Sequence, residues 1–403
     1  MDASRSELES AVAREVDARF EREQVPLLAR LVEQPSCTRE KDDVEAAFAI
    51  LDAAAEGAGL SITVHPDPSG VHAAHRVYAT RAIDGDARAL ALVGHLDTVF
   101  PRSMGFFGFR RDGDVARGPG VLDMKSGLTS ILAALTAVRA VSPERYEALR
   151  LRFVCVSDEE VGSPSSSSLF AALAPGTSEA LVFEAGRKQD RIVTRRKGGG
   201  LFRIEARGTA AHAGNAHARG VSAIWALARA IDRVERLTDY ARGLTVSVGL
   251  VEGGTAKNTV PDLASCWIDA RFETARDLAW LEAQLAAIAA DPFGEDAAVP
   301  ERVRGATLSL SGGATRPPME ATDASQALRA RYEACAIDAG LLAGEAPLQG
   351  GGSDACLLAA AGVPSIDGLG PFGEKFHERE EWCSLSSLRR RTEALARFLV
   401  RHA

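Results

Sequence analysis

Short apolar runs and amphipathic stretches alternate along most of the chain. An apolar run at residues 88–98 is followed by a stretch at 126–141, and two further apolar runs lie at 149–160 and 179–186. Within residues 126–141 the apolar positions recur at helical spacing, at Leu128, Ile131, Leu132, Leu135 and Val138. Buried strands that alternate with helices in this way predict a parallel sheet covered by helices.

The order of the predicted elements changes near residue 195. From there we expect a strand at 199–208, a helix at 220–237, strands at 243–254 and 262–272, a helix at 275–290 and a strand at 302–313. This β-α-β-β-α-β order is that of a ferredoxin-like domain. Alternation resumes after residue 314 and ends in an amphipathic helix from about residue 384. We therefore predict an α/β domain formed by residues 1–195 and 314–403, interrupted by a smaller α+β domain at 196–313.

Composition narrows the class of protein. The chain has 403 residues, of which 46% are hydrophobic and 25% charged, as is usual for a globular protein of about two domains. Its net charge of −8, with no basic run longer than residues 195–197 or 389–391, argues against a nucleic-acid partner. Those two short runs are expected to be ordinary solvated faces.

Neither a membrane partner nor a disulfide framework is expected. The charged N-terminal segment lacks an apolar signal core, and no stretch approaches 18 uninterrupted apolar residues. The six cysteines are scattered without CxxC spacing, which favours free thiols in a reducing compartment. We therefore expect a cytoplasmic protein.

Potential metal ligands follow the predicted strands of the larger domain. His95 lies near the end of the first run, Glu159 and Glu160 end the second, and Glu184 follows the apolar residues of the third. Asp123 lies in a glycine-rich crossover before the helix at 126–141. Open α/β sheets place their ligand sites at the carboxyl ends of strands, so we expect these side chains to converge.

Two further residues complete this candidate site. Asp97, two positions after His95, lies on the same side of an extended chain and is expected to orient the imidazole. His377 lies in a loop before the last helix. Each residue alone has an ordinary alternative: a strand-end histidine, a helix cap at Asp123, or solvated loop charges at the two adjacent glutamates. Together, imidazole and carboxylate ligands suit zinc, with cobalt or manganese possible, and a shared carboxylate would give a two-metal hydrolytic site.

Several motifs, in order, resemble one known family. They are "GHLDTV", "GPGVLDMKSG", "SDEEVGS", "EAG", "GTAAHAG", "IDARF" and "GGGSDA", and the resemblance runs from about residue 25 to the C-terminus. The family is that of the co-catalytic dinuclear zinc peptidases and amidases, which includes bacterial glutamate carboxypeptidase, aminoacylase, acetylornithine deacetylase and succinyl-diaminopimelate desuccinylase. The resemblance implies a zinc-peptidase-type catalytic domain, with a mixed, largely parallel sheet and helices on both faces, and an inserted ferredoxin-like lid or dimerisation domain.

The resemblance also implies a role for each candidate residue. One zinc ion would be held by His95 and Glu184, the other by Glu160 and His377, and Asp123 would bridge them. Asp97 would orient His95. Glu159 would be the general base, since a glutamate beside the metal-bound water, but not itself a ligand, can move its proton.

In the inserted domain, the resemblance implies that His212 of "GTAAHAG" reaches the active site of the partner subunit in a homodimer. Arg316 and Asn258 match positions that bind a substrate carboxylate, and Gly351 and Gly352 belong to a glycine-rich substrate loop. The glutamate-cleaving branch carries a lysine after the "EAG" motif. Here only Lys188 or Arg191 can take its place, which puts a preference for glutamate in doubt.

The resulting hypothesis is a metal-dependent hydrolase of the amide or peptide bond of an N-acyl amino acid or dipeptide-like substrate with a free carboxylate. One alternative is a family member redirected to amide formation or to carboxylate binding in a biosynthetic pathway. A serine hydrolase is a weaker alternative, because "GGGSDA" lacks the G-x-S-x-G pattern.

Overall fold

The computed structural model of the chain describes residues 2–80, 88–294 and 298–402. It contains two compact units. Unit 1 comprises Met1–Arg195, Ala321–Gln349 and Ser353–Ala403, and unit 2 comprises Arg196–Glu320 together with Gly350–Gly352. Unit 2 is thus inserted in the sequence of unit 1.

Unit 1 is built on a six-stranded sheet with the order β1-β2-β6-β3-β7-β14. Strands β3, β6, β7 and β14 run parallel, and at one edge β2 pairs antiparallel with β6 and β1 pairs antiparallel with β2. The sheet is therefore mixed and largely parallel, which confirms the predicted α/β class. The strands are β1 (Ser61–His65), β2 (His75–Ala79), β3 (Ala89–His95), β6 (Leu151–Val156), β7 (Thr177–Val182) and β14 (Ser365–Ile366).

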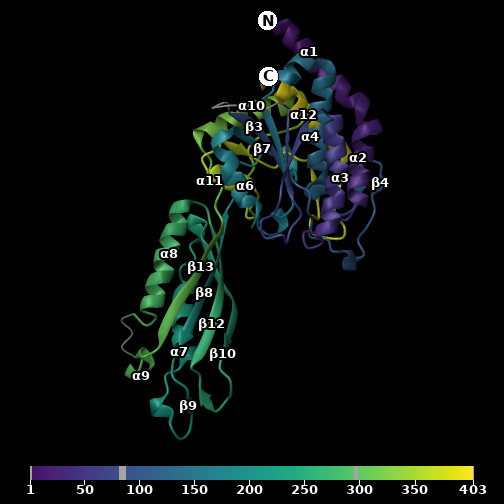
Figure 1. Cartoon of the computed structure of the whole chain (residues 1–403). Coiled ribbons are helices and arrows are strands. Elements are labelled where there is room, and N and C mark those ends of the chain that lie inside the picture. The colour runs from purple at the N-terminus through teal and green to yellow at the C-terminus, as the bar shows by residue number, and fades with distance from the viewer. Residues whose placement is uncertain (1, 81–87, 295–297, 403) are drawn as a thin grey trace. The chain divides into compact units, whose positions relative to one another are not determined.

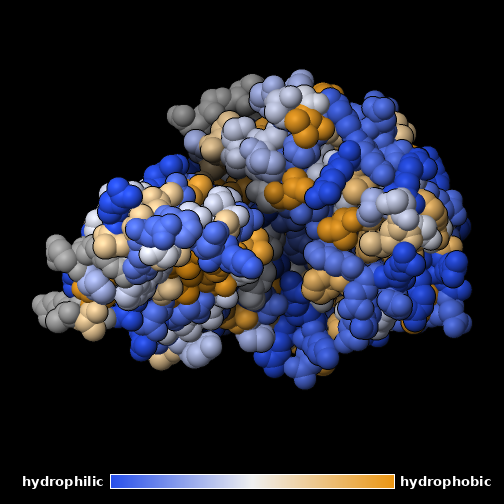
Figure 2. Space-filling model, turned by 90° about the horizontal axis from the view of Figure 1, so that it is seen from below, coloured by the Kyte–Doolittle hydropathy of each residue, from blue (hydrophilic) through white to orange (hydrophobic). Residues whose placement is uncertain are grey.

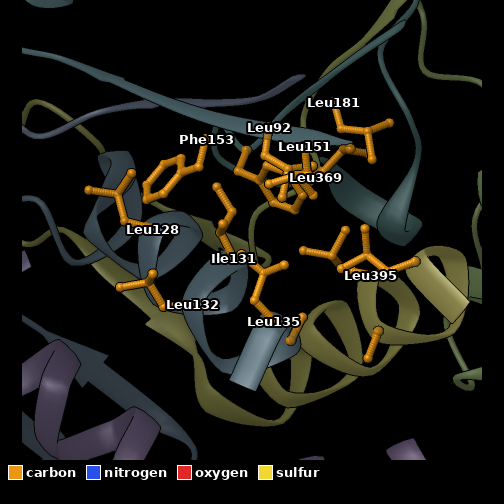
Figure 3. Close-up of a cluster of buried hydrophobic side chains, with 14 of the residues drawn as sticks. Leu92, Leu128, Ile131, Leu132, Leu135, Leu151, Phe153, Leu181, Leu369 and Leu395 are labelled. Carbon is orange, nitrogen blue, oxygen red and sulfur yellow. The ribbon is translucent and has the colours of Figure 1, made fainter. Parts of the chain in front are cut away.

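Helices cover both faces of this sheet, and in Figure 1 α6 and α11 lie on the opposite side of β3 and β7 from α3, α4 and α12. The α4 segment coincides with the predicted helix at 126–141, and its apolar stripe packs onto side chains of β3, β6 and β7 (Figure 3). The helices of unit 1 are α1 (Asp2–Arg19), α2 (Val25–Glu33), α3 (Lys41–Gly57), α4 (Ser126–Val141), α5 (Pro143–Ala148), α6 (Ser166–Leu173), α10 (Asp323–Asp338), α11 (Ala355–Ala360) and α12 (Leu385–His402).

A second, four-stranded sheet in unit 1 joins the end of the chain to its middle. Its order is β15-β16-β5-β4, and the pairing of Trp382 with Arg117 brings the C-terminal segment against the loop that carries Asp123. His377 lies between β15 and β16. This sheet therefore brings His377 close to Asp123, which lies 254 positions earlier in the chain. Its strands are β4 (Arg110–Asp112), β5 (Val115–Arg117), β15 (Gly373–Glu374) and β16 (Trp382–Ser384).

Unit 2 has a four-stranded antiparallel sheet with the order β10-β12-β8-β13. With α7 and α8 packed on one face, this is the predicted ferredoxin-like arrangement. A separate pair of short strands, β9 and β11, lies apart from that sheet. The elements are β8 (Gly198–Arg207), β9 (Ala211–His212), α7 (Ala223–Glu235), β10 (Thr245–Gly253), β11 (Thr259–Val260), β12 (Leu263–Phe272), α8 (Ala275–Ala290), α9 (Glu301–Arg304) and β13 (Thr307–Arg316).

The last strand of unit 2 differs from its prediction at both ends. Residues 301–304 form α9, so the predicted strand at 302–313 begins only at Thr307. The strand then continues to Arg316, past the predicted domain boundary after residue 313, because it pairs with β8 as far as Gly199. Unit 2 accordingly extends to Glu320.

Among the described residues, one segment, Val121–Val141, is long and apolar enough to cross a membrane by length and composition alone. However, 83% of that window is buried inside the fold, as expected of a core helix. Figure 2 shows mostly hydrophilic side chains on one face of the molecule, with hydrophobic ones scattered among them. The six cysteines form no disulfide and are all buried.

Candidate metal centre

The carboxyl ends of three parallel strands carry the first group of candidate ligands. His95 is the last residue of β3 and is 1% exposed, while Glu184 follows β7 and is 8% exposed. Glu159 and Glu160 follow β6 in a short 3₁₀ turn that ends at Gly162, whose φ is 93°. The register of β3 with β6 and β7 puts these ends at one edge of the sheet.

Asp97 anchors this edge. Its carboxylate accepts hydrogen bonds from the backbone N–H groups of Glu159 (3.3 Å) and Glu160 (3.2 Å) and from the hydroxyl of Thr38 (2.7 Å). Its Oδ1 also lies 3.4 Å from Nδ1 of His95, and its backbone oxygen lies 3.0 Å from the same nitrogen. Asp97 therefore holds both the imidazole of His95 and the turn that carries the two glutamates.

Asp123 lies between two histidines. Its Oδ1 is 3.3 Å from Nε2 of His95, and its Oδ2 is 3.3 Å from Nε2 of His377. Oδ1 is buried, and within the described residues no donor approaches it with hydrogen-bond geometry. A carboxylate that turns each oxygen toward a different imidazole is arranged as a bridging ligand requires.

Each half of the site is completed by one glutamate. Nε2 of His95 lies 3.7 Å from Oε1 of Glu184, and Nε2 of His377 lies 3.1 Å from Oε2 of Glu160. Two ligand atoms bound about 2.1 Å from one tetrahedral zinc ion stand about 3.4 Å apart. The observed separations therefore fit ligands around a common ion in each half.

The electrostatics of the site favour bound cations. Burial raises the pKa of Glu160 to about 8 and that of Glu184 to about 7. Asp123 and Glu160 raise the pKa of His377 to about 10, and Glu184 with neighbouring carboxylates raises that of His95 despite its burial. Burial opposes ionisation of Asp123, but His377 and His95 outweigh it and lower its pKa. The carboxylates of Asp123, Glu160 and Glu184 lie so close together that they need positive charge nearby. Metal ions supply that charge when they replace the protons on the ligand side chains.

The loop that carries Asp123 is held by two buried residues that the sequence reasoning did not identify. The carboxylate of Glu381, which has no exposed surface, accepts hydrogen bonds from the N–H groups of Gly120 (2.9 Å), Leu122 (2.8 Å) and Asp123 (2.9 Å). Lys125 is also fully buried and donates to the backbone oxygen of Gln34 at 3.0 Å. Glu381 is one of several acidic residues in "HEREEW", so its sequence context does not distinguish it from solvated charge.

In unit 2 the structure groups two of the predicted residues around β9 and β11. His212 pairs with Thr259, and the backbone oxygen of Asn258 accepts a hydrogen bond from the N–H of Ala213 at 2.9 Å. Nδ1 of His212 accepts from the N–H groups of Gly214 (3.1 Å) and Asn215 (3.0 Å). The ring therefore carries its proton on Nε2, and the side chain is exposed.

The other predicted substrate residues lie together at a second place in unit 2. Arg316 ends β13 and is 9% exposed, and a Cβ atom at Gly352 would lie 2.4 Å from its Cδ. Gly351 accepts a hydrogen bond through its backbone oxygen from Arg196 at 2.9 Å. Only glycine at position 352 lets the loop approach the Arg316 side chain this closely.

The serine of "GGGSDA" has a structural role. Ser353 is 1% exposed, and its hydroxyl donates to Oδ2 of Asp367 at 2.6 Å. A buried hydroxyl already bonded to a carboxylate is not presented to a substrate. This contact removes the basis for the serine-hydrolase alternative.

The family model of peptidase family M20/M25/M40 matches residues 91–401. The chain belongs to this family. Among curated relatives, carboxypeptidase G2 of Pseudomonas sp. (strain RS-16) is 26% identical over 379 residues, which cover 93% of this chain and 88% of that protein. The solved structure of aminopeptidase PepT from Bacillus cereus ATCC 10987 matches 94% of this chain and 98% of its own, with a TM-score of 0.76 and 21% identity.

A dinuclear metal-binding peptidase of the M20 family from Bacillus subtilis matches 96% of this chain and 99% of its own, with a TM-score of 0.70 and 16% identity. At such identities the two solved structures show the fold. The M20-family model and the carboxypeptidase relative confirm the predicted class of protein: this M20 protein is a metal-dependent hydrolase that cleaves amide or peptide bonds. Its five candidate ligands lie together at one edge of the unit 1 sheet.

Proposed function

We propose that the M20 protein holds two zinc ions, one through His95 and Glu184 and the other through Glu160 and His377, with Asp123 shared between them. The observation that carries this proposal is the position of Asp123, whose two oxygens each lie 3.3 Å from a different imidazole. Imidazole and carboxylate donors suit zinc, and cobalt or manganese are the replacements that this donor set accepts.

Glu159 is the proposed general base. Ions held here would supply Lewis-acid chemistry, by lowering the pKa of a water molecule and polarising the carbonyl of the scissile bond. Glu159 would take the proton of the attacking water and deliver it to the leaving amine. Its half-buried side chain belongs to the same turn as Glu160, and Asp97 holds that turn through its backbone N–H groups.

His212 is the proposed donor to the developing oxyanion. Its two backbone hydrogen bonds keep the proton on Nε2, so the ring offers one N–H to a substrate oxygen. We place this contribution in the active site of the partner subunit of a homodimer.

The proposed dimer contact is the edge of unit 2 formed by β10 and the start of α7. β10 is an edge strand, and Leu250 and Val251 on it are 63% and 58% exposed. Ile224 of α7, 44% exposed, packs near Gly253 and Gly254 at the end of β10. An exposed edge strand beside apolar side chains favours pairing with a second copy of the same surface.

The proposed substrate is an N-acyl amino acid or dipeptide-like amide whose amine side carries a free carboxylate. The guanidinium of Arg316 is suited to bidentate carboxylate binding, with Asn258 and the backbone of Gly351 and Gly352 as further contacts. No preference for glutamate is proposed, since Arg191 donates to the backbone oxygen of Glu345 and to Gln189. Six cysteines that form no disulfide favour a cytoplasmic setting.

A metal and substrate screen tests this proposal. The protein loaded with zinc is offered a panel of N-acyl amino acids and dipeptides, each paired with the analogue whose terminal carboxylate is amidated, and products are detected by mass spectrometry. We expect two ions per chain, turnover that stops on chelation and returns with zinc or cobalt, and hydrolysis of the free acids alone. Turnover that persists after complete removal of metal would disprove the proposal.

A further inference from the structure

A pocket of about 440 Å³ opens on the helical side of unit 1. It lies where the π-helical turn η1 (Phe20–Gln24) joins α1 to α2, and its other walls are α3 and α4. Three arginines line it, namely Arg19, Arg22 and Arg30, and Leu27, Leu132 and Ala133 contribute apolar surface. We call it the arginine pocket. No residue of the candidate metal centre lines it.

The arginine pocket carries positive charge that its surroundings do not balance. Arg19 is paired with Glu15 (2.6 Å) and Glu23 (2.9 Å). Arg22 donates through Nε to the backbone oxygen of Ala18, and within the described parts of the chain neither Arg22 nor Arg30 has a carboxylate partner. The charged lining of the pocket is thus three arginines against one glutamate, Glu23, which pairs with Arg19. Such a pocket favours a ligand with a negative head group.

The backbone provides a second, independent indication. A π-helical turn interrupts the ladder of an α-helix, and such turns are frequent at functional sites. Here the turn places Arg22, Glu23 and Gln24 at the pocket, while Phe20 is buried and does not line it. Gln24 is 2% exposed and donates to the hydroxyl of Thr392 at 2.8 Å, so the inner side of the turn is tied to α12.

We propose that the arginine pocket binds a small amphipathic anion, namely a carboxylate with a medium-length apolar chain, at a site separate from the metal centre. The volume lies within the range of about 300–1,000 Å³ that is typical of small-molecule sites, which are mostly apolar with a few polar groups. The head group pairs with Arg22 and Arg30, because a guanidinium binds a carboxylate through two parallel hydrogen bonds. The chain lies on Leu27, Leu132 and Ala133.

Octanoate is the probe, titrated by calorimetry into the full-length, metal-loaded protein. We expect saturable binding, at least about tenfold weaker in the Arg22→Gln/Arg30→Gln double variant because a charge-assisted pair is lost. Ala133→Trp, which fills the pocket, is expected to abolish binding. Arg14→Gln is the matched control, since Arg14 is an exposed arginine of α1 that does not line the pocket. Octylamine and octanol, which lack the carboxylate, are expected to bind the wild-type protein no more tightly than octanoate binds the double variant.

Two results would overturn the proposal. One is the absence of saturable octanoate binding to the wild-type protein. The other is binding that the double variant and Ala133→Trp leave unchanged, which would place octanoate at the metal centre or elsewhere. The double variant changes two exposed side chains, so a correctly folded protein is expected, and circular dichroism checks this.

Discussion

Replacing Glu381 tests whether the loop of the bridging carboxylate is held from the C-terminal segment. Oε1 of Glu381 accepts the N–H groups of Leu122 and Asp123, and Oε2 accepts that of Gly120. Glu381→Ala leaves three buried donors without an acceptor, at about 1–3 kcal/mol each. Glu381→Gln retains one oxygen but turns an amide N–H group toward one donor, which costs about 1–3 kcal/mol in total.

Loss of the hydrogen bonds to Glu381 is expected to lower the metal affinity of the site as well as the stability of the fold. Asp123 is the proposed shared ligand, and partners that orient a ligand typically contribute about 10–100-fold to metal affinity. We therefore expect Glu381→Gln to remain folded and to bind zinc about 10–100-fold more weakly than the wild-type protein. Glu381→Ala is expected to lose metal and several kcal/mol of unfolding free energy together.

Zinc content is measured by mass spectrometry after dialysis against buffers of graded free zinc, and unfolding by denaturant is followed by circular dichroism. Glu378→Gln is the matched control, because Glu378 lies in the same loop and, among the residues that the structure describes, its exposed carboxylate pairs only with Lys375, at 3.0 Å. It removes the same charge without touching the loop of Asp123. Wild-type zinc affinity in Glu381→Gln would refute the reasoning, since the hydrogen bonds would then be irrelevant to the ligand.

Further predictions concern the base, the partner histidine, the metals and the thiols. Glu159→Gln is expected to lower kcat about 10²–10⁴-fold with unchanged zinc content, and zinc loss in that variant would instead make Glu159 a ligand. When the Glu159→Gln and His212→Ala variants are mixed and their subunits exchange, about half of the dimers contain one subunit of each kind. If His212 acts across subunits, one of the two active sites in each mixed dimer is intact, so about a quarter of wild-type activity is expected to return. No recovery would contradict that role. Chelation is expected to lower the Tm by several degrees, as scanning calorimetry measures, because the ions bind only the folded state. A thiol reagent is expected to label the cysteines, all buried, only after unfolding.

Local patterns in the sequence were enough to predict several features. The helix at 126–141 agrees with α4 because its apolar stripe is a property of consecutive residues, and the order of elements in unit 2 follows from the same kind of periodicity. His95, Glu160 and Glu184 lie together because each ends or follows a parallel strand, and parallel strands bring their carboxyl ends to one edge. His377 follows no strand of that sheet, and only the resemblance to the family indicated its role in the site.

Features that depend on contacts between distant segments were decided by the tertiary structure. Glu381 resembles its acidic neighbours in the sequence, and its role exists only because β16 pairs with β5 and carries it to the loop of Asp123. The end of β13 at Arg316 was likewise set by pairing with β8, which a local pattern does not contain. The arginine pocket requires η1, α2, α3 and α4 to meet. The sequence by itself therefore determined the elements and their chemistry, whereas long-range packing decided which side chains hold, orient or surround a site.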